Sequence, residues 1–288
     1  MAYFLTRPLS QLSKAARRLA NGKLSVRVRP RGHDEMGQLG RDFNDMADQL
    51  EANVKDLTNA MERQEQFMGS FAHELKTPMT SIIGYADLLR SDALSHDEAM
   101  DAANYIFSEG KRLEALSLKL LDLLVMDNQS VQMSRVEPAQ LISGLVRHLQ
   151  PVYAEKGIRL QCKCLPGACY LEGDLVKSLL TNLLDNARKA MDEDGGNIFV
   201  ISDWFDGACR IRVLDNGRGI PQDKLEHVTE AFYRVDKSRS RKQGGAGLGL
   251  TLCSRIVQLH NGDIRFDSRE NNGTCVTVLL RGKEAQGG

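Results

Sequence analysis

The sequence predicts a multidomain chain in which an all-α region is followed by an α/β sandwich. At 288 residues the chain exceeds one ordinary domain. Up to about residue 130, apolar residues recur at helical spacing in stripes that no single helix could bury. After Pro138, short runs of β-strand type alternate with amphipathic helices. We therefore expect two or three domains, of which the helical ones pair with a second copy of the chain.

Charge is balanced overall but uneven along the chain. Lys+Arg and Asp+Glu both count 38, so no net field indicates a nucleic-acid partner. Between Met1 and Arg31 there are eight basic residues and no acidic one, which is typical of a segment just inside a membrane or of a solvated helix face. No run of about 18 apolar residues occurs, and residues 2–5 are compatible with the stub of a transmembrane helix that the chain lacks.

The six cysteines indicate a reduced, cytoplasmic environment. They are scattered, without CxxC pairs or nearby histidines, in a chain with no signal peptide. Cys162 and Cys164 alternate within a strand-like run, so we interpret them as structural residues rather than metal ligands.

The first fifty or so residues predict a helix, an extended connector and a second helix. Pro8 suits the first turn of a helix that Asn21-Gly22 ends. Residues 24–28 alternate in an extended stretch, and the next helix is expected to begin near Asp34-Glu35. No breaker interrupts it before about residue 64, so helix rotation or tilt could pass downstream.

Two more amphipathic helices are expected between about residues 65 and 130. They join near residues 91–96, where Ser95 or Asp97 could cap the second helix. Two such hairpins from two chains would form a four-helix bundle.

The remaining chain predicts an α/β sandwich with one long irregular stretch, 221–245, that is expected to be a mobile lid. The expected strands are 158–165, 198–203, 209–214, 263–267 and 274–280, and the expected helices are 139–156, 174–191 and 248–259.

His73 is a candidate nucleophile on the first helix of the hairpin. It lies about 200° round the helix from Phe71 and Leu75, so it points away from the apolar stripe. Pro78 cannot donate to the carbonyl of Glu74, so the helix should loosen within one turn. The Glu74 carboxylate could orient the imidazole and take its Nδ1 proton while Nε2 attacks. The alternative is a capped and kinked structural helix.

Asn182, Asn186 and Lys189 form a second candidate site, because the spacing i, i+4, i+7 places them on one helix face. Amide oxygens together with phosphate oxygens suit Mg²⁺, and an ammonium can meet phosphate as a point charge. Such a pattern is equally compatible with a solvated face.

Asp215 follows a predicted strand and is succeeded by Gly217 and Gly219. A carboxylate here could accept the exocyclic amine of adenine, while the two glycines let the backbone approach the base. By itself Asp-x-Gly-x-Gly is also a common tight turn.

A glycine-rich segment with Gly245, Gly247, Leu248 and Gly249 opens the last helix, whose free N–H groups could bind phosphates. It does not fit a Walker loop or a dinucleotide fingerprint. Upstream, Phe232-Tyr233-Arg234 and a basic run could clamp a triphosphate as a lid closes; the alternative is a disordered polar loop. The basic run consists of Lys237, Arg239, Arg241 and Lys242.

The order and spacing of these motifs resemble three known modules. Pro8, Asp34-Glu35-Met36-Gly37 and Phe43-Asn44-Asp45-Met46 resemble the HAMP signal-relay module. Ser70–Pro78 resembles the phospho-acceptor box of histidine kinases. The asparagine helix, Asp-x-Gly-x-Gly, the aromatic-Arg lid and Gly-x-Gly-Leu-Gly-Leu resemble the ATP-binding domain shared by histidine kinases, gyrase, the Hsp90 chaperones and MutL.

The resemblance covers nearly the whole chain and implies the cytoplasmic portion of a homodimeric sensor histidine kinase. Its domains would be HAMP (1–53), a connecting helix (54–63), a dimerisation and histidine phosphotransfer domain (64–130) and a catalytic ATP-binding domain (136–283). The full protein would be anchored at the cytoplasmic face of the membrane through segments absent from this chain.

The resemblance also implies the chemistry. ATP and Mg²⁺ would be the cofactors, with Asn186 on the metal, Asp215 on adenine, and Gly245, Gly247 and Gly249 in the phosphate loop. His73 would be autophosphorylated and would pass phosphate to an aspartate of a response regulator. A Glu-x-x-Thr pattern such as Glu74 to Thr77 supports phosphatase activity toward that regulator in related kinases.

One departure from the family pattern keeps an alternative open. Ala190 stands where such kinases often carry an aromatic residue that stacks on adenine, so nucleotide could bind more weakly, or Tyr233 could compensate. A pseudokinase scaffold therefore stays an alternative. An ATP-driven conformational machine of the gyrase or Hsp90 type would need a catalytic carboxylate near Ser178 and would lack the phospho-acceptor box, and neither condition holds.

Overall fold

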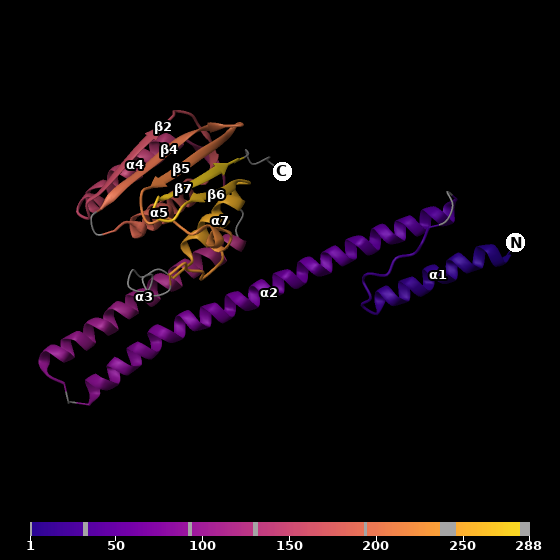
Figure 1. Cartoon of the computed structure of the whole chain (residues 1–288), viewed down its shortest axis with the longest axis horizontal. Coiled ribbons are helices and arrows are strands. Elements are labelled where there is room, and N and C mark those ends of the chain that lie inside the picture. Colours follow the sequence, from indigo (N-terminus) through magenta and orange to yellow (C-terminus); the bar gives the residue numbers. More distant parts are fainter. Residues whose placement is uncertain are drawn as a thin grey trace. The chain divides into compact units, whose positions relative to one another are not determined.

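The computed structural model describes residues 2–30, 34–91, 94–128, 132–192, 195–236 and 246–282 (Figure 1). The chain divides into two compact units, Met1–Ser70 and Phe71–Gly288. Helix α2 (Glu35–Arg90) runs through the boundary between them without interruption. The four domain boundaries expected from the sequence stay a prediction.

The first unit contains helix α1 (Ala2–Ala20), an extended connector and the N-terminal part of α2. Pro8 was expected in the first turn of α1, but the helix already begins at Ala2, so the proline lies inside it. A proline there removes only one helical hydrogen bond, and the turns continue on either side. The start of α2 is as expected, since the N–H of Gly37 donates to Asp34 Oδ1 at 2.9 Å.

The two helices of this unit meet through small and aromatic side chains. Ala15 and Leu19 of α1 are buried against Phe43 and Ala47 of α2. Apolar residues of the connector pack on the same cluster at its edge; they are Leu24, Val26 and Val28. The alternation expected for the connector is therefore real, although the segment forms no β-strand.

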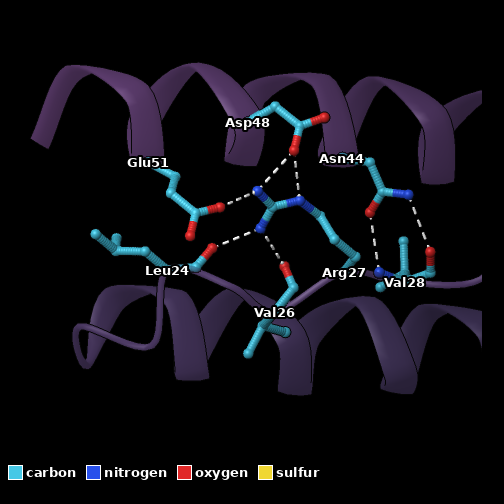
Figure 2. A network of polar contacts seen from close by, with 7 residues as sticks. All are labelled: Leu24, Val26, Arg27, Val28, Asn44, Asp48 and Glu51. Carbon is cyan, nitrogen blue, oxygen red and sulfur yellow. Dashed lines mark hydrogen bonds and ion pairs between the residues drawn. The ribbon is translucent and has the colours of Figure 1, made fainter. Parts of the chain in front are cut away.

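Polar contacts attach the connector to one face of α2 (Figure 2). The guanidinium of Arg27 donates to Asp48 Oδ1 from Nε at 2.7 Å and to Glu51 Oε2 from Nη2 at 2.6 Å. Its Nη1 donates to the carbonyls of Leu24 and Val26 at 2.5 and 2.9 Å. We call this arrangement the Arg27 clasp.

A second attachment lies one turn away on the same helix. The Asn44 amide accepts the N–H of Val28 and donates to the carbonyl of Val28, both at 2.9 Å. This side chain pairs with both backbone groups of one residue, as a neighbouring strand would. The connector is thus fixed to α2 at two points without a sheet.

The second unit begins with a helical hairpin formed by the end of α2 and by α3 (His96–Asn128). Ser95 is the cap, as one of the two expected candidates: its N–H donates to Glu98 Oε2 at 2.8 Å, and the N–H of Glu98 reaches Ser95 Oγ at 3.4 Å. The two helices are joined by stacked rings of Tyr85 and Tyr105, with centroids 4.8 Å apart.

An α/β sandwich completes the second unit. Its five-stranded sheet has the order β2-β4-β5-β7-β6, in which β2 and β4 are parallel and all other neighbours are antiparallel. The strands are β2 (Ile158–Cys164), β4 (Gly196–Phe205), β5 (Ala208–Asp215), β6 (Asp263–Ser268) and β7 (Thr274–Leu280). Helices α4 (Pro138–Ala154), α5 (Gly173–Ala190) and α7 (Gly249–Leu259) pack on one face of it (Figure 1).

The expected strands and helices of the sandwich are confirmed to within about two residues. The sequence did not reveal the small sheet of β1 (Ser134–Val136) and β3 (Cys169–Leu171), or the 3₁₀ helix η1 (Gln222–His227). Strands of three residues show no periodicity that a sequence pattern could detect. Cys162 and Cys164 lie in β2 as expected, and all six cysteines are free thiols.

A buried histidine ends α7 and ties it to the sandwich. His260 is fully buried; its Nδ1 lies 2.8 Å from the Ile256 carbonyl, and its Nε2 accepts the N–H of Glu172 at 3.1 Å. An accepting Nε2 requires a neutral ring with the proton on Nδ1. Burial lowers the pKa of His260 below its usual value, which keeps the ring neutral.

We expect the sandwich to lose stability as the pH falls from 7 to 5. The unfolded chain protonates this imidazole below about pH 6.5, whereas the native ring must remain neutral, so unfolding takes up a proton. His260→Gln should cost about 1–3 kcal/mol at pH 7 and should flatten the dependence on pH. Urea unfolding followed by the fluorescence of Trp204, the single tryptophan, measures both effects. The exposed His148→Gln should keep the parental pH slope, and an unchanged slope in His260→Gln would contradict the assignment.

Candidate functional site

A pocket in the second unit lies between α5, the segment after β5, the segment before residue 237 and the start of α7. Eight of the candidate binding residues line it: Asn186, Lys189, Asp215, Gly219, Tyr233, Arg234, Gly247 and Gly249. Asn182, Gly217 and Leu248 are not among the lining residues. Gly245 and the basic run of the expected lid lie outside the described residues.

Helix α5 supplies the polar wall of the pocket because its opposite face is fixed in the core. Six apolar side chains of α5 are buried, at the spacing of one helix face: Val176, Leu179, Leu180, Leu183, Leu184 and Ala187. Their burial determines the rotation of the helix about its axis. Asn186 and Lys189 line the pocket, whereas Asn182, predicted on the same helix face, is not among its lining residues.

Asp215 lies at the end of β5 with its carboxylate in the pocket wall. Burial raises the pKa of this carboxyl, and hydrogen bonds from the backbone N–H groups of Gly217 and Thr274 oppose that shift. The N–H of Gly217 lies 2.9 Å from Asp215 Oδ1. A carboxylate held in place this way is a strong acceptor for a ligand N–H group.

Two glycines of the pocket occupy positions that exclude side chains. Gly219 and Gly247 have positive φ angles of 67° and 73°. A Cβ at Gly247 would lie 2.8 Å from the carbonyl carbon of Phe232, and one at Gly219 would collide with the carbonyl of Arg269. Both segments therefore approach the pocket as bare backbone, which the glycine motifs predicted.

Leu248 serves the core rather than the pocket. It was a candidate binding residue, but its side chain is fully buried and packs inside the domain. Helix α7 starts directly after it, and no side chain caps this end. The first N–H groups of α7 therefore have no side-chain partner, which favours an anion.

Three residues of the pocket carry buried donor nitrogens without hydrogen-bond partners in the described part of the chain. They are Asn186 Nδ2, Arg218 Nη1 and Arg234 Nη1. Buried polar groups are usually paired, so such a group indicates a missing ligand. Because all three are donors, the expected ligand is rich in acceptors, as a phosphate chain is.

The phospho-acceptor box, residues 70–78, contains exposed, half-buried and buried positions of α2. His73 is exposed, as predicted, and α2 passes Pro78 without ending. The Glu74 carboxylate forms ion pairs with Arg112 of α3, at 3.6 Å, and with Arg234. His73, Glu74 and Thr77 do not line the pocket, but Arg234 belongs to both places.

Thr77 forms a hydrogen bond within α2. Its hydroxyl donates to the His73 carbonyl at 3.2 Å, the backward bond typical of threonine in a helix. This bond orients the hydroxyl along α2, one turn from the histidine.

The sequence missed several residues of the site. Lys119, Arg218 and Thr274 line the pocket, and Arg112 pairs with Glu74. Thr274 lies opposite Asp215 in the pairing of β5 with β7, which only the sheet register reveals. Arg218 was visible inside the Asp-x-Gly-x-Gly motif, whereas nothing in the local pattern marked Lys119 or Arg112.

Three family models match the chain in the order that the resemblance implied. Residues 1–52 match the HAMP domain, residues 63–129 match the His Kinase A (phospho-acceptor) domain, and residues 172–284 match the histidine kinase-, DNA gyrase B- and HSP90-like ATPase. The expected modules are thereby confirmed.

Relatives with similar sequences are sensor kinases. The signal transduction histidine-protein kinases AfsQ2 of Streptomyces coelicolor and BaeS of Escherichia coli are each 30% identical over 97% of this chain. The chain covers 53% of the length of AfsQ2 and 58% of that of BaeS.

Solved structures of histidine kinases share the fold. The structure of ThkA in complex with the response regulator protein TrrA has a TM-score of 0.63 and 20% identity, over 82% of this chain and 68% of that chain. The full-length structure of ShkA in complex with AMPPNP has a TM-score of 0.54 and 23% identity, over 75% of this chain and 45% of that chain. With the three modules in place, the chain belongs to the sensor histidine kinase family.

We expect Asp215→Asn to raise the dissociation constant for ATP by about 10- to 100-fold. The substitution keeps the shape of the side chain but replaces a charged acceptor with an amide, which costs about 1.5–3 kcal/mol in a desolvated site. Titration calorimetry measures the change, with Asp206→Asn, on the exposed turn after β4, as the matched control. Equal affinities of the parent and Asp215→Asn would show that the adenine does not bind there.

Proposed function

We propose that this chain is an ATP-dependent protein-histidine kinase that phosphorylates His73 and then transfers the phosphate to an aspartate of a response regulator. The observation that carries the proposal is the pocket of unpartnered donors around Asp215, linked through Arg234 to the carboxylate beside His73. A nucleotide site and a phospho-acceptor box thus share one arginine.

In the proposed reaction, Nε2 of His73 attacks the γ-phosphorus of ATP, a P–N bond forms, and the bond to the ADP oxygen breaks. Glu74 accepts the Nδ1 proton as the Nε2 lone pair forms the P–N bond, so the phosphorylated imidazole is left neutral. Asn186 fits a Mg²⁺ ligand because Mg²⁺ prefers oxygen donors and needs few of them from protein. Bound Mg²⁺ would offset the negative charge of the phosphates, as Lys189 and Arg234 would from the protein side.

The donors of the pocket support ATP as the phosphoryl donor. Asp215 provides an acceptor for the amine of adenine, and Asn186, Arg218 and Arg234 provide unpartnered donors for acceptors of the nucleotide such as phosphate oxygens. Ala190 and Tyr233 both line this pocket, so Tyr233 is available to contact the base where Ala190 lacks an aromatic ring.

We also propose that the chain acts as a homodimer. Large apolar side chains on α2 and α3 are exposed in the single chain, at helical spacing that suits a bundle with a second copy. On α2 they include Met46, Leu50, Leu57 and Met61, and on α3 Leu118, Leu121 and Leu124.

The expected membrane association belongs to the proposal as well. Within the described ranges, no helix combines the length and the apolar character that crossing a bilayer requires. The basic bias of residues 1–31 supports a location beside a membrane surface.

We expect His73→Gln to abolish labelling by γ-labelled ATP and Mg²⁺ while leaving the affinity for ATP within about twofold of the parent. The acceptor and the pocket are built from different residues, so removing the imidazole leaves the binding site intact. A phosphohistidine in the parent should also be labile to acid. Stable label on His73→Gln, or an acid-stable product in the parent, would overturn the assignment. A parent that binds no ATP would instead favour the scaffold.

We further propose phosphatase activity toward the response regulator, carried by Thr77. Thr77→Ala should keep the autophosphorylation rate within a few fold, because the hydroxyl has no part in the attack of imidazole on ATP. Dephosphorylation of the regulator should fall by about tenfold or more, by analogy with the loss of one positioned polar group. Thr77→Ser keeps a hydroxyl and should retain most of the activity. Equal dephosphorylation rates of Thr77→Ala and the parent would leave only the bond to the His73 carbonyl as the role of Thr77.

A further inference from the structure

Lys119 of α3 reaches the nucleotide pocket from the helical hairpin. Every other residue that lines the described pocket lies between positions 183 and 276, in the α/β sandwich. The C-terminal part of α3 is held against that sandwich, because Met126 is buried in its core and Leu123 packs beside it. The ammonium of Lys119 is therefore presented from a fixed helix.

The immediate partner of Lys119 is an amide of α5. Its Nζ lies 3.4 Å from Asn182 Oδ1, a distance at the outer limit of a hydrogen bond. The Asn182 amide nitrogen is already used, since it donates to the Ser178 carbonyl at 2.9 Å. One weak, neutral acceptor is little compensation for a partly buried ammonium.

The charges around Lys119 do not neutralise it. Burial lowers the pKa of Lys119, and electrostatic repulsion by Lys189 lowers it further. Asp185 attracts it but is already bound by Arg188 and Lys189, at 2.5 and 2.8 Å. The thiol of Cys253 and the carboxylate of Asp122 add weaker attractions, which oppose the lowering of the Lys119 pKa. Two lysines thus line the same pocket, and the carboxylate of Asp185 forms its ion pairs with Arg188 and Lys189.

We propose that Lys119 is a phosphate-binding residue of the nucleotide site, so that the helical hairpin and the α/β sandwich hold the same triphosphate. An anion between Lys119 and Lys189 would turn their repulsion into two favourable contacts. The unpartnered donor of Asn186, one turn from Asn182 on α5, supports a ligand in this region. The inference rests on the proposed binding of ATP and adds a residue from a second domain.

The rival role for Lys119 is that of a strut between α3 and α5 through Asn182. The two roles predict different effects of removing Lys119 on the free energy of unfolding of the ligand-free protein. A strut stabilises the ligand-free protein, so its loss lowers the free energy of unfolding. A phosphate-binding lysine is desolvated and repelled without ligand, so its loss leaves the ligand-free protein as stable as before or more stable, while affinity for phosphates falls.

The test compares four forms of the full chain: the parent, Lys119→Gln, Lys119→Arg and the control Lys111→Gln. Lys111 lies on the same helix, is 61% exposed and pairs with Glu114. Titration calorimetry with Mg-ATP, Mg-ADP and adenosine gives the affinities, and urea unfolding without ligand gives the stability. Adenosine reports an intact base pocket without phosphate.

We expect Lys119→Gln to weaken ATP binding by about tenfold and to leave the affinity for adenosine within about twofold. Lys119→Arg should stay within about threefold of the parent for ATP, because it keeps the charge, and Lys111→Gln should match the parent throughout. The free energy of unfolding of Lys119→Gln without ligand should equal or exceed that of the parent.

Two results would overturn the inference while leaving the proposed function in place. One is an unchanged ATP affinity in Lys119→Gln; the other is an equal loss for ATP and adenosine together with lower stability, which is the behaviour of a strut. If the parent itself bound no ATP, the proposed function would fail and the inference with it.

Discussion

The burial of one face of α5 fixes the geometry of the nucleotide site. Six apolar residues of this helix pack into the core beneath the sheet, so the opposite face, with Asn186 and Lys189, has one orientation only. Asp215 is fixed by the same core, because β5 lies at the centre of the sheet between β4 and β7. The positions of Asn186, Lys189 and Asp215 in the pocket wall are therefore set by packing in the core.

Among the described residues, Arg234 connects the pocket with the phospho-acceptor box. Arg234 has a nearly buried side chain, lines the pocket and pairs with Glu74. The guanidinium of Arg234 thus pairs with Glu74, the carboxylate that would receive the imidazole proton of His73 in the proposed reaction. Arg112 pairs with the same carboxylate, so Glu74 has two cationic partners.

Local patterns were enough to predict most of the fold. The stripes of α2 and α3 and the period-2 runs of β4, β5 and β7 are long enough to identify each element, although members of the helical stripes such as Met46 and Leu124 are exposed in the single chain. Candidate residues that line the pocket could be predicted because each belongs to a short motif next to a predicted element; they are Asn186, Lys189, Asp215, Gly219, Gly247 and Gly249.

The sequence failed where a residue depends on a distant partner. Thr274 lies beside Asp215 only through the register of two strands, and Lys119 enters the pocket only because α3 packs on the sandwich. The burial of the Leu248 side chain was not predicted for a related reason: a motif gives the backbone path, whereas the direction of a side chain depends on the core around it. Pro8 fits a first turn in isolation, and it lies deeper in α1 because helix continues upstream.

The connector of the first unit has a mechanical consequence. Residues 24–28 form no regular structure, yet hydrogen bonds of the Arg27 clasp and of Asn44 attach them to α2 (Figure 2). Residues 27 and 28 are therefore attached to α2, so they can move away from that helix only if these contacts break. The carboxylates of this joint are about half to two-thirds exposed, so dissolved ions weaken it. The strength with which the connector is attached to α2 thus depends on the ionic strength of the solution as well as on the sequence.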